Sequence, residues 1–171
     1  EKPGQTRVIP LANAEQLEQA EPGGVGQRFL TRTQPSLEAQ LCNLADEIAY
    51  NAHDIDDGVR SGLITLEQLQ AVPLFDETRQ QALREHPQLE ESGAGRRLLY
   101  ESIRRMLSAQ VYDVIDATRA ELARTRPDSA DAARRLPPLL CFSAQMRERS
   151  VVLKKFLFQN LYRHPQVMQT T

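Results

Sequence analysis

The sequence predicts an all-α fold in which several helices pack around a shared core. Apolar residues recur at steps of three or four over most of the chain after residue 35, and no segment of useful length alternates with the period of a strand. Prolines and glycines divide this pattern into separate helices, without an internal repeat or low-complexity tract. The 171 residues, of which 40% are hydrophobic, suffice for one buried core.

The first 35 residues are predicted to be mostly loop or linker. They are rich in proline, glycine and polar residues, and a weak helical pattern over 14–20 ends at the helix-breaking run PGGVG. Because the first residue is Glu1 rather than Met, we expect a fragment or a processed chain. The helical part is predicted to span residues 36–171.

The first predicted helix begins after Ser36, whose side chain can cap it. Gly58 and Gly62 bracket its expected end. Its apolar residues fall near one stripe that we expect to face the core: Leu37, Leu41, Leu44, Ile48 and Ile55.

A capping box formed by Thr65 and Gln68 is predicted to open a short helix that ends near residue 72. Pro73 fits the first turn of another helix, which should end near His86 because a proline follows.

A long amphipathic pattern begins after the loop at 92–95 and predicts a helix to about Arg124. Prolines then flank an alanine-rich segment that can hold one short helix. Ser143 is predicted to cap a final helix that continues to Tyr162.

Composition and charge exclude several classes of protein. With 21 basic and 23 acidic residues, the global charge predicts no affinity for nucleic acid or anionic membranes. No apolar run approaches the roughly 18–20 residues that span a bilayer, and no signal segment opens the chain, so we expect a cytoplasmic protein. Cys42 and Cys141 are too few for a disulfide framework and form no zinc motif, so both are predicted to be reduced packing residues.

The most informative segment is an acidic stretch within residues 36–63. Five carboxylates fall within twelve residues without a lysine or arginine among them: Asp46, Glu47, Asp54, Asp56 and Asp57. On a helix, Asp46, Tyr50, His53 or Asp54, and Asp57 stack along one side. This side is either a solvated acidic face or an active-site wall that meets a cation and a polar ligand.

Two details favour the second interpretation. Small residues, Ala45 and Ala49, flank Asp46, and Tyr50 lies in the middle of the acidic side. No basic residue follows Asp46 one turn later, so its charge is not balanced within the helix. A divalent metal could balance it.

The run LADEIAYNAHDIDDGVRSGLI, residues 44–64, resembles the signature of the deoxyguanosinetriphosphate triphosphohydrolase-like (dGTPase-like) family. The later run LKKFLFQNLYRHPQV is similar to a pocket-lining helix of that family. The resemblance covers roughly residues 30–171. It implies a multi-helix bundle of the HD-domain type, of which this chain would be the C-terminal portion within a larger helical enzyme.

By this resemblance, Asp46 is the last of the family's metal ligands and therefore a catalytic residue. Tyr50 matches the tyrosine that packs on the deoxyribose, and Asp54 matches the aspartate near the sugar 3'-hydroxyl. The dipeptide His53-Asp54 is not expected to be the family's metal-binding pair, because no histidine precedes it. We interpret His53 as a helix-surface residue or one that supports the ligands.

A metal site with imidazole and carboxylate ligands needs at least three protein donors, and this chain supplies one. The other ligands, a histidine and a His-Asp pair, are therefore expected from the upstream part of the same protein. The chain alone is expected to be inactive.

The C-terminal helix is basic. Between residues 147 and 163, five basic residues stand against Glu148 alone, so this helix could hold the phosphates of a nucleotide. Lys154 and Tyr162 lie two turns apart on one face. The resemblance implies that Lys154 contacts phosphate and that Tyr162 contacts the sugar or base. Alternatively, both residues pack at a subunit surface.

The resemblance implies a metal-dependent enzyme that hydrolyses a deoxynucleoside triphosphate (dNTP) to the deoxynucleoside and triphosphate. The cofactor would be a divalent Mg, Mn, Ni or Fe ion. Family members commonly form homo-oligomers, and single-stranded DNA regulates some of them. Two alternatives remain: a non-catalytic helical interaction domain whose acidic helix binds a basic partner, and an HD-type phosphohydrolase of another nucleotide.

Overall fold

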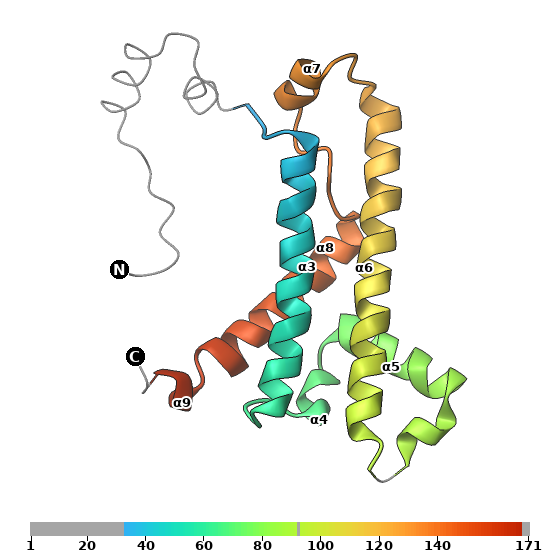
Figure 1. The fold of residues 1–171 in the computed structure, drawn as a ribbon, viewed down its shortest axis with the longest axis vertical. Helices are drawn as coiled ribbons and strands as arrows, with labels where there is room; N and C mark the ends of the chain where they lie inside the picture. The colour runs from blue at the N-terminus through green and yellow to red at the C-terminus, as the bar shows by residue number, and fades with distance from the viewer. Residues whose placement is uncertain (1–32, 92, 169–171) are drawn as a thin grey trace.

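The computed structural model describes residues 33–91 and 93–168, and all regular secondary structure within these ranges is helical (Figure 1). The prediction of an all-α fold is therefore confirmed. The weak helical pattern at 14–20 and nearly all of the expected loop at 1–35 lie outside the described residues. The elements are α3 (Leu37–Arg60), α4 (Leu66–Leu69), α5 (Pro73–Glu85), η1 (Pro87–Glu90), α6 (Gly95–Thr125), α7 (Ala130–Arg135), α8 (Ala144–Leu157), η2 (Phe158–Tyr162) and α9 (Pro165–Met168).

Two long helices, α3 and α6, run side by side and form the axis of the molecule (Figure 1). Helix α8 crosses them obliquely and contacts both α3 and α5. Helices α4 and α5 cover one end of the long pair, and the short α7 caps the other end. Because α8 crosses α3 instead of running parallel to it, the C-terminal arm diverges from α3 along its length.

Side-chain caps fix the helix starts where the sequence predicts them. The Ser36 hydroxyl accepts a hydrogen bond from the Ala39 N–H at 3.3 Å, and the Ser143 hydroxyl accepts one from the Met146 N–H at 3.2 Å. The predicted capping box is present, because Thr65 Oγ1 accepts from the Gln68 N–H and Gln68 Oε1 accepts from the Thr65 N–H. Each cap satisfies backbone donors that a helix start leaves without partners.

The core contains apolar side chains from α3, α4, α5, α6 and α8. Ile55, Leu69, Phe75, Met106 and Leu153 are all fully buried. Burial of such side chains from water is the main force that holds the helices together.

The apolar stripe of α3 is only partly buried. Ile48 and Ile55 are in the core, as predicted, but Leu41 is 51% exposed. The prediction for Leu41 is wrong because the residues with which α3 joins the buried core begin at Ile48, so Leu41 lies beyond the part of the helix that the core covers. Periodicity identifies the apolar side of a helix but not how far along the helix its partners extend.

A buried glutamine ties the start of α3 to the segment before α8. Gln40 is 6% exposed, and its Oε1 accepts hydrogen bonds from the backbone N–H groups of Leu139 and Leu140 at 3.0 and 3.2 Å. Its Nε2 donates to the Pro35 carbonyl at 3.0 Å. One side chain thereby satisfies three backbone groups.

The final helix departs from the prediction of one continuous α-helix to Tyr162. From Phe158 onward the chain forms a π turn, η2, in which the Arg163 N–H donates to the Phe158 carbonyl five residues earlier at 3.1 Å. The Arg163 guanidinium lies 4.7 Å from the centre of the Phe158 ring, a cation–π contact that stabilises the turn. Turns of this kind are rare and often occur at functional sites.

Within the described ranges, no helix is both long and apolar enough to cross a lipid bilayer.

Candidate functional site

An open groove of about 680 Å³ lies between α3 and the arm formed by α8 and η2. Four of the residues singled out in the sequence line it: Tyr50, Asp54, Lys154 and Tyr162. The structure therefore brings together side chains that are about 100 residues apart in the chain. The remaining lining residues are Asn43, Glu47, Asn51, Val151, Lys155, Leu157 and Phe158.

Helical spacing explains why these residues converge. On α3, Asn43, Glu47, Tyr50 and Asp54 follow one another at steps of four, three and four, so they share one face. The other wall of the groove is the arm formed by α8 and η2, and its lining residues also recur at steps of three and four: Val151, Lys154 and Phe158.

A carboxylate of α6 fixes the start of α8 and thereby the position of the second wall. Asp113 Oδ2 accepts a hydrogen bond from the Ser143 N–H at 2.8 Å, and its Oδ1 accepts one from the Ser143 hydroxyl at 2.6 Å. Since Ser143 also caps α8, this contact sets where the helix begins relative to α6.

At one end of the groove, the Tyr162 hydroxyl donates a hydrogen bond to Asp54 Oδ2. Partial burial, the hydrogen bond to Asp54 and the negative charge of that carboxylate raise the pKa of Tyr162 to about 12. The phenol therefore stays protonated at neutral pH, and the carboxylate remains an acceptor. Tyr50 is 69% exposed beside this pair and offers its ring to the groove.

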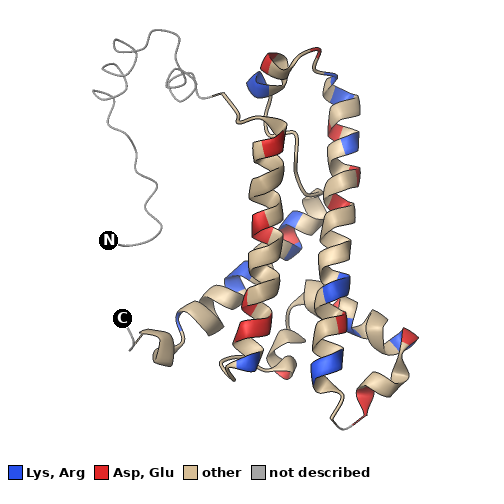
Figure 2. Ribbon diagram, in the orientation of Figure 1, with Lys and Arg blue, Asp and Glu red and all other residues tan. Residues whose placement is uncertain are grey.

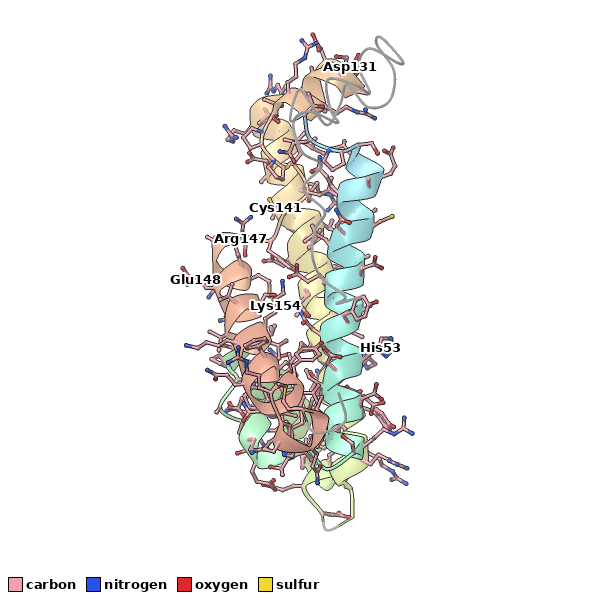
Figure 3. All side chains as sticks on the ribbon, turned by 90° about the vertical axis from the view of Figure 1, so that its left-hand side faces the viewer. His53, Asp131, Cys141, Arg147, Glu148 and Lys154 are labelled. Atoms are coloured by element: carbon pink, nitrogen blue, oxygen red, sulfur yellow. The ribbon has the colours of Figure 1, made fainter. Side chains whose placement is uncertain are left out.

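Further along the groove, Lys154 forms an ion pair with Glu47, with 2.7 Å between Nζ and Oε1. The same Glu47 oxygen accepts a hydrogen bond from the Ser150 hydroxyl at 3.2 Å. Figure 3 shows Lys154 reaching from α8 into the space beside α3. Charges of both signs therefore line the groove, with Glu47 and Asp54 from α3 and Lys154 and Lys155 from α8. Figure 2 marks the acidic positions along α3 and the basic positions along α8.

Asp46 lies at the edge of this arrangement. It is exposed on α3, one turn before Tyr50, and it does not line the groove. His53 is also exposed, on the side of α3 away from α8 (Figure 3). Among residues 33–91 and 93–168, no three His, Cys, Asp or Glu side chains are grouped closely enough to hold a metal ion. A metal at Asp46 therefore requires donors beyond the described residues.

Seven of the eleven lining residues are not among the site residues that the sequence predicts, and two of them carry polar groups with a clear place in the groove. Glu47 is one of the five carboxylates of the acidic stretch, and it lies three residues before Tyr50 and seven before Asp54 on the same face. Asn51 is 6% exposed, lines the groove, and its Nδ2 has no hydrogen-bond partner in the described part of the chain. The helical spacing could have identified Glu47, whereas nothing in the sequence marks Asn51.

The phosphohydrolase-associated domain model matches residues 140–171, the segment that contains α8, η2 and α9 and so the basic wall of the groove. The match assigns this C-terminal segment to the class of phosphohydrolase-associated domains.

Whole-chain comparisons narrow the class. The chain is 51% identical over 165 residues to a deoxyguanosinetriphosphate triphosphohydrolase-like protein of Ralstonia nicotianae, covering 96% of this chain and 42% of that protein. It is 55% identical over 149 residues to a protein of the same name in Bordetella pertussis, covering 87% and 38%. A third, from Thiobacillus denitrificans, is 48% identical over 157 residues, covering 92% and 39%. The chain belongs to the dGTPase-like family, which confirms the resemblance inferred from residues 44–64 and 153–167.

The chain spans about two fifths of the length of the curated relatives it matches.

Proposed function

We propose that this chain forms part of a metal-dependent dNTP triphosphohydrolase. In the proposed reaction, water attacks the α-phosphate, and the bond between that phosphorus and the 5'-oxygen breaks to give the deoxynucleoside and inorganic triphosphate. The observation that carries the proposal is the groove between α3 and α8, which gathers Tyr50, Asp54, Lys154 and Tyr162 in a chain whose relatives are named for this activity.

Four of the groove residues each offer a contact that suits one part of a dNTP. The exposed Tyr50 ring can pack on the deoxyribose, and the Asp54 carboxylate can accept a hydrogen bond from the 3'-hydroxyl. Tyr162 is held against Asp54 on the second wall, and its ring would contact the sugar or base. Lys154 is a compact positive charge suited to phosphate.

Asp46 is the residue that we propose as a metal ligand. It is exposed near the groove, and Tyr50 lies one turn away on the same side of α3. A metal held there, together with donors from outside the described residues, would polarise the phosphate and lower the pKa of its bound water. We also propose that the complete protein acts in the cytoplasm as a homo-oligomer, with single-stranded DNA as a regulator to be tested.

The test uses the full-length protein with Asp46 replaced by Asn. We expect loss of bound metal, measured by elemental analysis, together with at least a hundredfold loss of triphosphate release, because removal of a metal ligand disables the metal's chemistry. Asp116→Asn, an exposed aspartate on α6 outside the groove, is the matched control and should retain both. Full activity in Asp46→Asn would refute the metal assignment.

Product analysis separates the remaining alternatives. A triphosphohydrolase releases triphosphate from a dNTP, whereas a phosphohydrolase of another class releases orthophosphate or pyrophosphate. A non-catalytic interaction domain would leave dNTPs intact in the full-length protein.

A further inference from the structure

The ion pair between Glu47 and Lys154 places a carboxylate of the protein directly on one of the two lysines that line the groove. The two charged atoms are 2.7 Å apart, and both residues line the groove. The carboxylate takes one of the three N–H donors of the Lys154 ammonium, and a phosphate oxygen competes with it for that donor and for the charge.

Glu47 has a second partner on α8, whereas within residues 33–91 and 93–168 the Lys154 side chain is paired with Glu47 alone. The Ser150 hydroxyl donates to the same Glu47 oxygen at 3.2 Å, and Ser150 is only 2% exposed. The Glu47 carboxylate therefore keeps one contact with α8 if the lysine moves away. The Lys154 side chain, in contrast, is 46% exposed and can swing toward the groove.

The pair also separates two hollows. A smaller hollow of about 230 Å³ adjoins the groove and shares Glu47, Val151 and Lys154 with it. Arg147, two helical turns before Lys154, lines this second hollow. When Lys154 leaves Glu47, a bound anion can be attracted by the positively charged side chains that line the two hollows, Lys154 and Arg147.

An exposed ion pair of this kind is weak and easily exchanged. The side chains are 46% and 29% exposed, and such pairs contribute little net free energy because water competes for both charges. An incoming ligand with several negative charges can replace a single carboxylate on the lysine, whereas a ligand with one or two charges gains less from the exchange.

We propose that Glu47 is an internal competitor for Lys154, and that binding of a polyphosphate to the groove requires the lysine to leave this carboxylate. This inference rests on the proposed function, because it takes Lys154 as the residue that receives phosphate. Glu47 thereby acts as a positioning residue that weakens binding of every phosphate that takes Lys154, by the free energy of the ion pair that is lost.

The experiment measures binding of inorganic tripolyphosphate and of orthophosphate to the full-length protein by calorimetry. Glu47→Gln keeps the size of the side chain and its hydrogen bond from Ser150 but removes the charge. We expect the tripolyphosphate Kd to fall about two- to fivefold, the fold-change that corresponds to a typical exposed ion pair. The orthophosphate Kd should fall by a similar factor if orthophosphate also takes Lys154 from Glu47, because the same ion pair no longer has to be broken.

Glu77→Gln is the matched control. Glu77 pairs with Arg149 of α8 at 2.8 Å, so it is also an acid bound to this helix, but it does not line the groove. Its replacement should leave both Kd values unchanged. Thermal denaturation of every variant checks that the protein remains folded.

A double-mutant cycle with Lys154→Gln distinguishes the possible failures. If Lys154→Gln weakens tripolyphosphate binding and abolishes the gain from Glu47→Gln, the proposal stands. If Lys154→Gln weakens binding but Glu47→Gln alone leaves it unchanged or weaker, the competitor role is refuted while the phosphate role of Lys154 survives. If Lys154→Gln has no effect, the phosphate role assigned to Lys154 is refuted, and the inference about Glu47 with it.

Discussion

Replacement of Asp113 by Ala should loosen the second wall of the groove by releasing the start of α8. The carboxylate accepts two hydrogen bonds from Ser143, at 2.8 and 2.6 Å, in a partly buried position. Hydrogen bonds to a charged group each contribute roughly 1.5–3 kcal/mol. Because water can reach part of this site and Ser143 keeps its contact with the Met146 N–H, we expect a total loss of about 2–3 kcal/mol.

Urea denaturation followed by far-ultraviolet circular dichroism measures this loss as a lower transition midpoint at an unchanged slope. Asp113→Asn should cost about half as much, since the amide oxygen can still accept one of the two hydrogen bonds. Asp116→Ala is the matched control on the same helix. Its side chain is 77% exposed, so the expected change is below about 0.5 kcal/mol. A loss of less than about 0.5 kcal/mol in Asp113→Ala would refute the claim that this contact anchors α8.

Two further predictions concern ionisation. Tyr162 should titrate near pH 12, measured as the phenolate absorbance that the Tyr162→Phe variant lacks. Asp54→Asn should lower the pKa of Tyr162 only part of the way toward 10, because burial, the larger cause of the shift, remains. Since this pKa is raised on folding, its contribution to stability is present below about pH 10 and is lost as pH rises through about 12. Glu101, which accepts hydrogen bonds from Arg104, has a pKa lowered to about 2. The stabilising contribution of the Glu101 carboxylate should therefore be present above about pH 4.5 and disappear as pH falls through about 2. Glu101→Gln should lower the free energy of unfolding by about 1 kcal/mol at pH 7 and by progressively less below pH 4.5. An equal cost at pH 7 and pH 2 would contradict this assignment.

The sequence was sufficient to predict the parts of the fold that depend on local chemistry. Ser36, Thr65 and Ser143 cap helices where the pattern placed them, because a cap involves only neighbours within three residues. The exposure of Leu41 could not be predicted in the same way, since it depends on which helices pack against α3 at that level.

The candidate site was predictable only residue by residue. Tyr50, Asp54, Lys154 and Tyr162 were identified by resemblance, but their convergence in one groove depends on the angle at which α8 crosses α3. The ion pair of Glu47 arises from the same crossing and could not be inferred from charges 107 positions apart in the sequence. The assignment of Asp46 to a metal stays a prediction.

The π turn after α8 has a consequence for how this segment should be compared between relatives. A turn that closes over five residues rotates the chain less per residue than an α turn does. The side chains after the turn therefore point in other directions around the helix axis than they would in a continuous α-helix. The orientation of Tyr162 toward Asp54 thus depends on the wide turn as well as on the identity of the tyrosine. A relative that is one residue shorter between Phe158 and Tyr162 would present its aromatic ring in another direction, even where an alignment pairs the two tyrosines.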